Sequence, residues 1–176
     1  MLSQRFVASG GRDGLIHLFQ LCTTDMTLVD TVDDHEAHSV TGLAFNQDTT
    51  RLLSCGSDRS FIARDVKADG SLSPYFQDHA PHDPAQKSGG AFLDLALDSD
   101  GRLAIVASSD GTLRLYDALE ARRVGRVILQ SKAVAVRVVL DPSGTIAFCS
   151  CLDGSIHSYY LPNGSLIALS LSLIHI

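Results

Sequence analysis

SCGSDRSFIARDV (54–66) is repeated along the chain as ASGGRDGLIHLFQ (8–20), ASSDGTLRLYDAL (107–119) and SCLDGSIHSYYLP (150–162). Each copy has small residues, an aspartate, a turn residue, and then a run of alternating apolar residues that ends in an aromatic residue or a substitute for one. Alternation with a period of two is typical of a strand with one buried face, so each copy predicts two strands joined by a turn. The sequence therefore contains four copies of one structural unit.

The aspartates of the four copies set the length of the repeat. Asp13, Asp58, Asp110 and Asp153 are separated by 45, 52 and 43 residues. A period of about 40–45 residues is that of WD repeats, each of which forms one four-stranded blade of a β-propeller. The long interval contains residues 78–89, DHAPHDPAQKSG, whose Pro and Asp content predicts a loop insertion between two blades.

The strands within a repeat follow from apolar alternation and turn residues. An inner strand such as Leu93, Leu95 and Leu97 is followed by a turn rich in Asp, Ser and Gly, and no segment shows a helical period. We therefore predict an all-β fold, an incomplete WD-repeat β-propeller of about three and a half to four blades of four-stranded antiparallel sheets. The expected blades within a propeller region 1–168 are 1–36, without its inner strand, 37–77, 90–130 and 131–168.

The composition restricts the partners of the chain. Its net charge is −6, from 20 acidic and 14 basic residues, and no basic run exceeds Arg122-Arg123, so we expect no nucleic-acid partner. The longest apolar run, 166–176, is too short to cross a bilayer, and the N-terminus has no signal-peptide pattern. We therefore expect no membrane partner and a cytoplasmic location. Three of the four cysteines lie in apolar strand segments and are expected to be buried thiols.

The repeated aspartate has a structural interpretation in WD repeats. There it accepts a hydrogen bond from a histidine in the loop that enters the same blade, and we expect His38 to pair with Asp58. A catalytic Ser–His–Asp arrangement would also need an exposed nucleophile and an oxyanion site, which the sequence does not supply. The predicted structural network consists of His38, Asp13, Asp58, Ser60, Asp110, Thr112 and Asp153.

Other polar residues are candidates for contact with a partner protein. Arg12 and Arg59 project from turns where many repeats have small residues, and arginine is enriched at interaction hot spots, so they could anchor an acidic segment. The alternative is that they are solvated turn residues. The predicted insertion adds the partner-binding candidates Asp78, His79 and His82.

Metal sites are weaker interpretations of the same residues. In the insertion, Asp78, His79, His82 and Asp83 are residue types that bind metals. The Cys149-x-Cys151 pair and the His35-x-x-His38 pair are two other possible metal sites. A Cys-x-Cys pair lacks a second half at ligand spacing, and acidic loops gather His and Asp by chance. We therefore expect no metal and no cofactor.

A closer resemblance covers about residues 5–168. The segments that carry it are Arg12–His17, Leu28–His35 with its Asp33-Asp34-His35 end, Leu53–Ser60, Val138–Thr145 and Asn163–Ala168. In this order they resemble the WD-repeat family of mitogen-activated-protein-kinase-binding protein 1 and WD-repeat-containing protein 62. The resemblance implies a piece of a large scaffold with two tandem propellers, which acts in kinase signalling and at the centrosome or spindle pole. The kinase-docking elements of that family lie downstream of the propellers, so kinase binding is assigned to no residue here.

The expected function is that of a non-catalytic scaffold that binds other proteins, among them signalling kinases or centrosomal proteins through the full-length chain. The alternatives are a microtubule- or cytoskeleton-associated structural propeller and, less favoured, a propeller enzyme. For an enzyme, Asp94 and Arg137 are the charged residues of the predicted inner strands. Residues 169–176, LSLSLIHI, depart from the family pattern and are expected to be an atypical tail, an artefact of a truncated or mistranslated end, or else a real outer strand.

Overall fold

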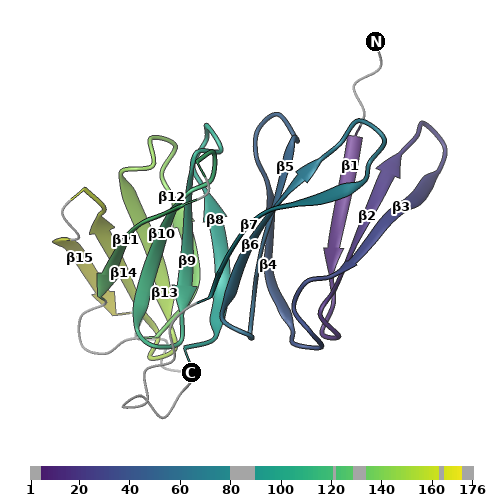
Figure 1. Cartoon of the computed structure of the whole chain (residues 1–176). Coiled ribbons are helices and arrows are strands. Elements are labelled where there is room, and N and C mark those ends of the chain that lie inside the picture. Colours follow the sequence, from purple (N-terminus) through teal and green to yellow (C-terminus); the bar gives the residue numbers. More distant parts are fainter. Residues whose placement is uncertain (1–4, 80–89, 121, 129–133, 163–164, 172–176) are drawn as a thin grey trace.

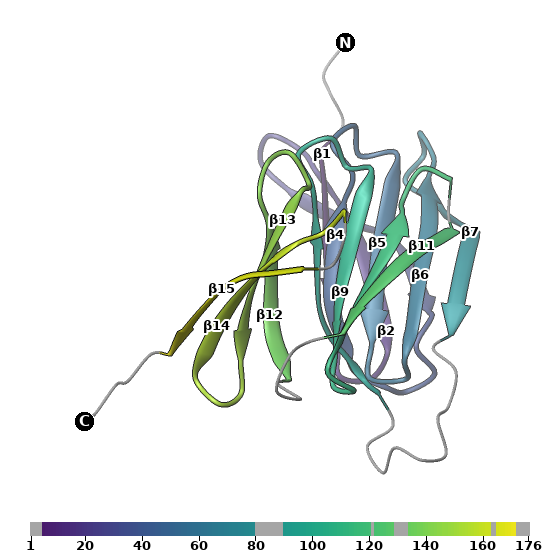
Figure 2. The ribbon, with the colours of Figure 1, turned by 90° about the vertical axis from the view of Figure 1, so that its left-hand side faces the viewer.

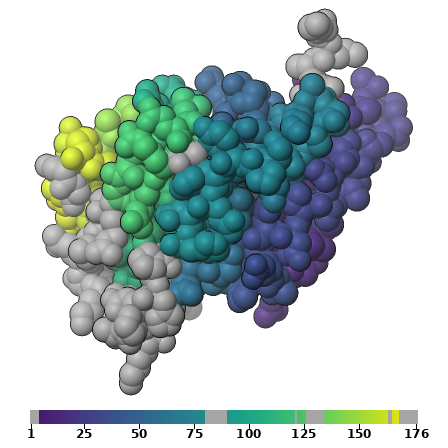
Figure 3. Space-filling view, viewed as in Figure 1, coloured from purple at the N-terminus to yellow at the C-terminus, as the bar shows by residue number. Residues whose placement is uncertain are grey.

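The computed structural model describes residues 5–79, 90–120, 122–128, 134–162 and 165–171. Within these ranges the chain forms fifteen strands and no helix, and hence no helix that could cross a membrane. The strands make four antiparallel sheets that stand side by side along the molecule (Figure 1). The space-filling view shows the four as successive bands of colour (Figure 3). The prediction of an all-β, incomplete WD-repeat propeller is confirmed.

Each sheet is one blade, and its strands are neighbours in chain order. The first blade has three strands, β1 (Arg5–Gly10), β2 (Leu15–Leu21) and β3 (Met26–Asp33). The second blade comprises β4 (Val40–Phe45), β5 (Arg51–Gly56), β6 (Ser60–Val66) and β7 (Leu72–His79). The third comprises β8 (Phe92–Leu97), β9 (Leu103–Ser108), β10 (Thr112–Asp117) and β11 (Arg122–Ile128). The fourth comprises β12 (Ala135–Leu140), β13 (Ile146–Cys151), β14 (Ser155–Tyr160) and β15 (Ser165–Leu171).

The strand borders differ from the sequence prediction at two places. β7 continues to His79, which pairs with Ser60, so Asp78 and His79 belong to a strand rather than to the insertion. β15 continues to Leu171, so the first residues of the predicted tail extend an outer strand. Residues 80–89, the rest of the insertion, and 172–176, the rest of the tail, lie outside the described residues.

The hydrophobic core lies between adjacent blades. We call the side of a blade that packs against the next blade its forward face. It consists of the residues five and three positions before the turn aspartate and those three and five positions after it. In the second blade the forward face consists of Leu53, Cys55, Phe61 and Ala63. The third blade packs against this forward face with its own backward face. The backward face consists of inner-strand residues, of the residues six and four positions before the turn aspartate, and of the residues four, six and eight positions after it. Tyr116 of that face stacks on Phe61, with ring centroids 4.1 Å apart.

Polar contacts fix the same interfaces. Asp94, on the inner strand β8, accepts hydrogen bonds from the Val138 backbone N–H (2.9 Å) and from Arg137 (3.1 Å) on the neighbouring inner strand β12. The pair proposed for an enzyme is thus used to join two blades. Close stacking also explains Gly144 in the β12–β13 turn, where φ is +67° and a Cβ would lie 3.1 Å from Asp98 of the third blade.

Candidate interaction site on the second blade

A buried histidine links the turn aspartate of the second blade to two serines. His35 follows β3, and its side chain is fully buried. Its Nδ1 lies 2.9 Å from Oδ1 of Asp58 and its Nε2 lies 3.0 Å from Oγ of Ser54. Ser60 completes the group, because its hydroxyl donates to Asp58 and lies 2.9 Å from Nδ1 of His35. The loop that enters the blade is thereby held to the β5–β6 turn.

The predicted pairing of His38 with Asp58 is wrong, because His35 occupies that place. His38 is exposed, and its ring Nδ1 contacts the backbone carbonyls of His35 (3.2 Å) and Glu36 (3.0 Å). The cause is the backbone between the two histidines, where Glu36 and Ala37 have φ of +45° and +62° and turn the chain away. Gly56 makes room for the His35 ring, since a Cβ at Gly56 would lie 2.5 Å from the imidazole Nδ1.

The other predicted aspartates each bind their own turn, with different partners. Asp110 accepts from the Thr112 hydroxyl (2.5 Å) and from Arg114 (2.7 Å). Asp153 accepts from the backbone N–H (3.0 Å) and hydroxyl (2.5 Å) of Ser155. Asp13 is exposed and accepts only the N–H of Leu15 (3.2 Å) among the described contacts. Of the four blades, the described residues show a loop histidine on the turn aspartate only in the second.

Burial and hydrogen bonding act in opposite directions on these carboxyl groups. Burial by itself raises the pKa of Asp58, but the hydrogen bonds from His35 and Ser60 outweigh it and hold the pKa below its ordinary value. The pKa of Asp110 is lowered in the same way by Thr112, Ser108 and Arg114 against the effect of burial. Both aspartates are therefore ionised in the folded chain at neutral pH.

The order Ser54–His35–Asp58 matches the connectivity of a catalytic triad. However, Ser54 is 2% exposed and His35 is 0% exposed. A nucleophile must reach the reacting carbon of its substrate, and this hydroxyl is buried against His35. The arrangement can orient a loop, but it offers a substrate no access in this conformation.

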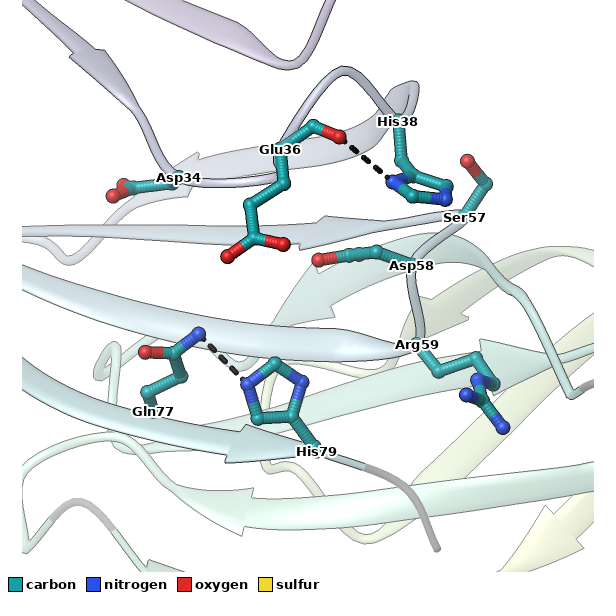
Figure 4. A pocket seen from close by; sticks show the side chains of 8 residues that line it. All are labelled: Asp34, Glu36, His38, Ser57, Asp58, Arg59, Gln77 and His79. Carbon is teal, nitrogen blue, oxygen red and sulfur yellow. Dashed lines mark hydrogen bonds between the residues drawn. The ribbon is translucent and has the colours of Figure 1, made fainter. Parts of the chain in front are cut away.

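Above this buried group lies a pocket of about 310 Å³ (Figure 4). It is formed by the loop after β3, the β5–β6 turn and the end of β7, and its lining residues are Asp34, Glu36, His38, Ser57, Asp58, Arg59, Gln77 and His79. Figure 4 shows the carboxylates of Asp34, Glu36 and Asp58 toward one end and the guanidinium of Arg59 at the other. The pocket is therefore dipolar.

Some charged side chains of the pocket are paired within the protein, and others have no partner among the described residues. Asp34, with a side chain 4% exposed, accepts two hydrogen bonds from Arg64, one of them at 2.6 Å from Nε. Sequence reasoning missed this ion pair, although Arg64 stands where the Trp of the WD dipeptide would be. Among the described residues, the side chains of Glu36 and Arg59 form no hydrogen bond and no ion pair.

Arg59 has a strained backbone. Its φ is +71°, in the left-handed region, where the other three blades have Gly14, Gly111 and Gly154 at φ of +87°, +77° and +81°. A side chain in this conformation costs roughly 1–2 kcal/mol. Such strain persists where the surrounding structure imposes it, and it is frequent at binding sites.

The predicted partner-binding residues are not all in the pocket. Arg59 and His79 line it, whereas Arg12 is exposed on the turn of the first blade. Asp78 is engaged inside the protein, because its Oδ2 accepts from the Tyr116 hydroxyl at 3.0 Å and so ties β7 to the third blade. His82 lies outside the described residues, and within the described ranges no three His, Cys, Asp or Glu residues are grouped so as to hold a metal.

Comparisons with known proteins agree with the repeat. The family described as "WD domain, G-beta repeat" matches residues 26–62 and 84–117. WD repeat-containing protein 62 from Mus musculus and from Sus scrofa are each 27% identical to the chain over 165 residues. The match covers 92% of this chain but 10% of each relative, so the chain spans about a tenth of their length. Together with four stacked sheets of the expected period, these matches support the interpretation of the chain as WD repeats of an incomplete β-propeller.

Proposed function

We propose that the chain is a non-catalytic scaffold and binds a segment of another protein at the pocket of the second blade. The observation that carries the proposal is Arg59, which lines a 310 Å³ pocket, has a left-handed backbone, and forms no hydrogen bond or ion pair with the other described residues. Loops on a rigid β framework are the usual binding elements of a domain. Here the framework under the loops is fixed by His35, Asp58 and Ser60.

The partner segment is expected to be acidic at the residue that meets Arg59, because a carboxylate can accept two hydrogen bonds from a guanidinium. Glu36 lies toward the opposite end of the pocket and favours a basic or neutral residue there. Arg12, on the neighbouring blade, offers a second cation outside the pocket.

The experiment is a binding assay with three sets of labelled peptides of equal length, one acidic, one neutral and one basic. Acidic peptides should bind, and Arg59→Glu should raise their Kd at least about tenfold, since one charge-assisted contact is worth roughly 1.5–3 kcal/mol. The matched control is Arg102→Glu, on the β8–β9 turn at the other edge of the sheets, where Arg102 is 62% exposed. Equal effects of the two variants, or no preference for acidic peptides, would refute the site.

The wider role follows the family resemblance and is part of the same proposal. We place the chain in a cytoplasmic scaffold for kinase signalling or for the centrosome and spindle pole, where it binds neither nucleic acid nor membrane. A tagged chain should colocalise with a spindle-pole marker in mitotic cells, and diffuse staining at every stage would contradict this assignment.

A microtubule-associated structural propeller is the second candidate function. Co-sedimentation separates the two, because a microtubule-binding module pellets with polymerised tubulin and a peptide-binding scaffold stays in the supernatant. An enzyme is disfavoured, since the only described inner-strand pair of opposite charge, Asp94 and Arg137, is engaged in joining the third and fourth blades.

A further inference from the structure

Two histidines stand in the lining of the second-blade pocket. His38 belongs to the loop after β3, His79 is the last residue of β7, and both residues are exposed. Figure 4 shows the His38 ring above Asp58 and the His79 ring below it. β7 is the outer strand of its blade and lies at the outer edge of the sheets (Figure 2). Both rings can therefore exchange protons with solvent.

The contacts of the two rings show where each one takes up a proton. Nδ1 of His38 lies 3.0 Å from the backbone carbonyl oxygen of Glu36. Because a carbonyl only accepts, Nδ1 carries the ring hydrogen of His38 and Nε2 is left to be protonated. Nε2 of His79 lies 2.9 Å from the side-chain amide nitrogen of Gln77, which only donates, so this contact belongs to the neutral ring. When His79 is protonated, the exposed Gln77 amide must turn its oxygen toward the ring.

Protonation of both rings would reverse the sign of the charge of the pocket. With neutral rings the lining carries the three carboxylates of Asp34, Glu36 and Asp58 against the guanidinium of Arg59. Arg64 offsets Asp34 from outside the lining, which leaves a net charge of −1. Two imidazolium groups change this charge to +1. Histidine is the residue type that ordinarily changes charge between about pH 5 and 8, whereas carboxyl groups ordinarily do so near about pH 4.

The neighbouring elements do not cancel this reversal. The β1–β2 turn packs against the loop after β3, since a Cβ at Gly14 would lie 2.8 Å from the backbone nitrogen of Ala37. The charged or titratable groups that the surroundings add are Arg12 and Asp13 of that turn, Asp78 and Arg123 toward the third blade, and His35 beneath Asp58. The first four are two acid–base pairs without net charge, and the fully buried His35 is not part of the pocket lining.

We propose that protonation of His38 and His79 strengthens the binding of acidic segments at this pocket, so that affinity rises as solution becomes mildly acidic. This inference rests on the proposed function and adds a regulation of the same site. With neutral rings, the carboxylates of Glu36 and Asp58 oppose any further carboxylate of the partner, and two imidazolium groups offset them. An exposed charge contact is worth roughly threefold in affinity, so the two rings together should lower the Kd about tenfold.

The test is the Kd of an aspartate-rich peptide, measured by fluorescence anisotropy at about pH 7.5 and about pH 5.5 and at constant ionic strength. Aspartate ordinarily has a pKa of about 3.9, so the peptide keeps its charge at both values. The unchanged chain should bind about tenfold more tightly at the lower pH, and the double variant His38→Gln with His79→Gln should lose this response. His17→Gln is the matched control and should keep it, since His17 lies on β2 of the first blade and contacts Thr31.

Calorimetry supplies a second measurement that needs no variant. Titrations of the unchanged chain near about pH 6.5, in two buffers of different ionisation enthalpy, should show that binding takes up protons, because the effects of protons and peptide on one another are reciprocal. Equal Kd values at the two pH values without proton uptake would overturn this inference and leave the proposed function standing. A pH response that persisted in the double variant would also overturn it. Absence of binding at both pH values would overturn the proposed function as well.

Discussion

His35 and His38 make a matched pair for testing what holds the second blade together. His35 is fully buried, with its imidazole nitrogens 2.9–3.0 Å from Asp58, Ser60 and Ser54, whereas exposed His38 contacts only backbone carbonyls of its own loop. His35→Ala removes a hydrogen bond to a charged group, worth roughly 1.5–3 kcal/mol, and leaves buried hydroxyls without their partner at roughly 1–3 kcal/mol. We therefore expect a loss of about 3–4 kcal/mol of unfolding free energy.

Urea denaturation and calorimetry measure this loss directly. For a chain of this size, about 3–4 kcal/mol corresponds to a fall in Tm of about 6–16 °C. His38→Ala should change the unfolding free energy by less than about 0.5 kcal/mol, as is usual for exposed side chains. Equal destabilisation by the two substitutions, or a larger effect of His38→Ala, would refute the assignment of His35 as the residue that holds the loop.

Four further predictions concern strain, pH, thiols and the joint between blades. Arg59→Gly should stabilise the chain by about 0.5–1 kcal/mol in urea denaturation, because it relieves the left-handed strain that the turn imposes, and should weaken binding of acidic peptides at the same time. The folded pKa of Asp58 is lowered, so its ionised form stabilises the fold above about pH 4, the ordinary value, and this stabilisation is lost as the pH falls through the lowered pKa. The stability difference between the unchanged chain and Asp58→Asn should therefore be full at pH 6 and shrink in acid, and a difference that grows in acid would contradict the sign. Burial raises the pKa of Cys55 and of Cys149 to about 12, so a thiol reagent at pH 8 should label exposed Cys22 rapidly and the three buried cysteines only on unfolding. Asp94→Ala should cost about 1–3 kcal/mol, because it leaves the buried Val138 N–H without its acceptor; a change below about 0.5 kcal/mol would show that the third and fourth blades are not joined there.

The sequence predicted the fold well because the information for it is local and repeated. Short apolar segments such as Leu103–Ala107 and Leu113–Tyr116, bounded by turn residues, define strands without knowledge of any distant contact. The expected single buried face does not hold for these two strands, because each central blade is packed between two others and buries both faces. The turn aspartates then give the period, which selects the propeller among all-β folds. The outer strands were harder to delimit. β7 extends to His79 because Tyr116 of the next blade holds Asp78, and that contact joins residues 38 positions apart.

The candidate site was predicted only in part, since it depends on the path of one loop. A histidine in the loop before β4 was expected, but two histidines stand there, and the choice between them rests on the left-handed backbone of Glu36 and Ala37. Neither glutamate nor alanine is a residue type that favours this conformation, so it could not be predicted from the sequence. Arg59, in contrast, was proposed from the sequence, because it stands in a turn where many repeats have small residues, and the structure places it in the lining of the pocket. The ion pair of Asp34 and Arg64 joins the loop to β6 and has no local signal.

The four turns also show why a decayed repeat can keep its fold. In the second, third and fourth blades the hydroxyl two residues after the aspartate donates to it, from Ser60, Thr112 and Ser155. The partly buried aspartates of the second and third blades each have a further partner, His35 and Arg114, whereas Asp153 is exposed and has no such partner among the described residues. The residue two before the aspartate is Gly56 in the second blade, where a Cβ would lie 2.5 Å from Nδ1 of His35. In the third blade it is Ser108, and the further partner of the aspartate there is Arg114, from the strand after the turn. A larger residue at position 56 should therefore be tolerated only when the His35 imidazole is removed as well. Gly56→Ser alone should therefore destabilise the second blade, and His35→Ala should make that second change nearly neutral.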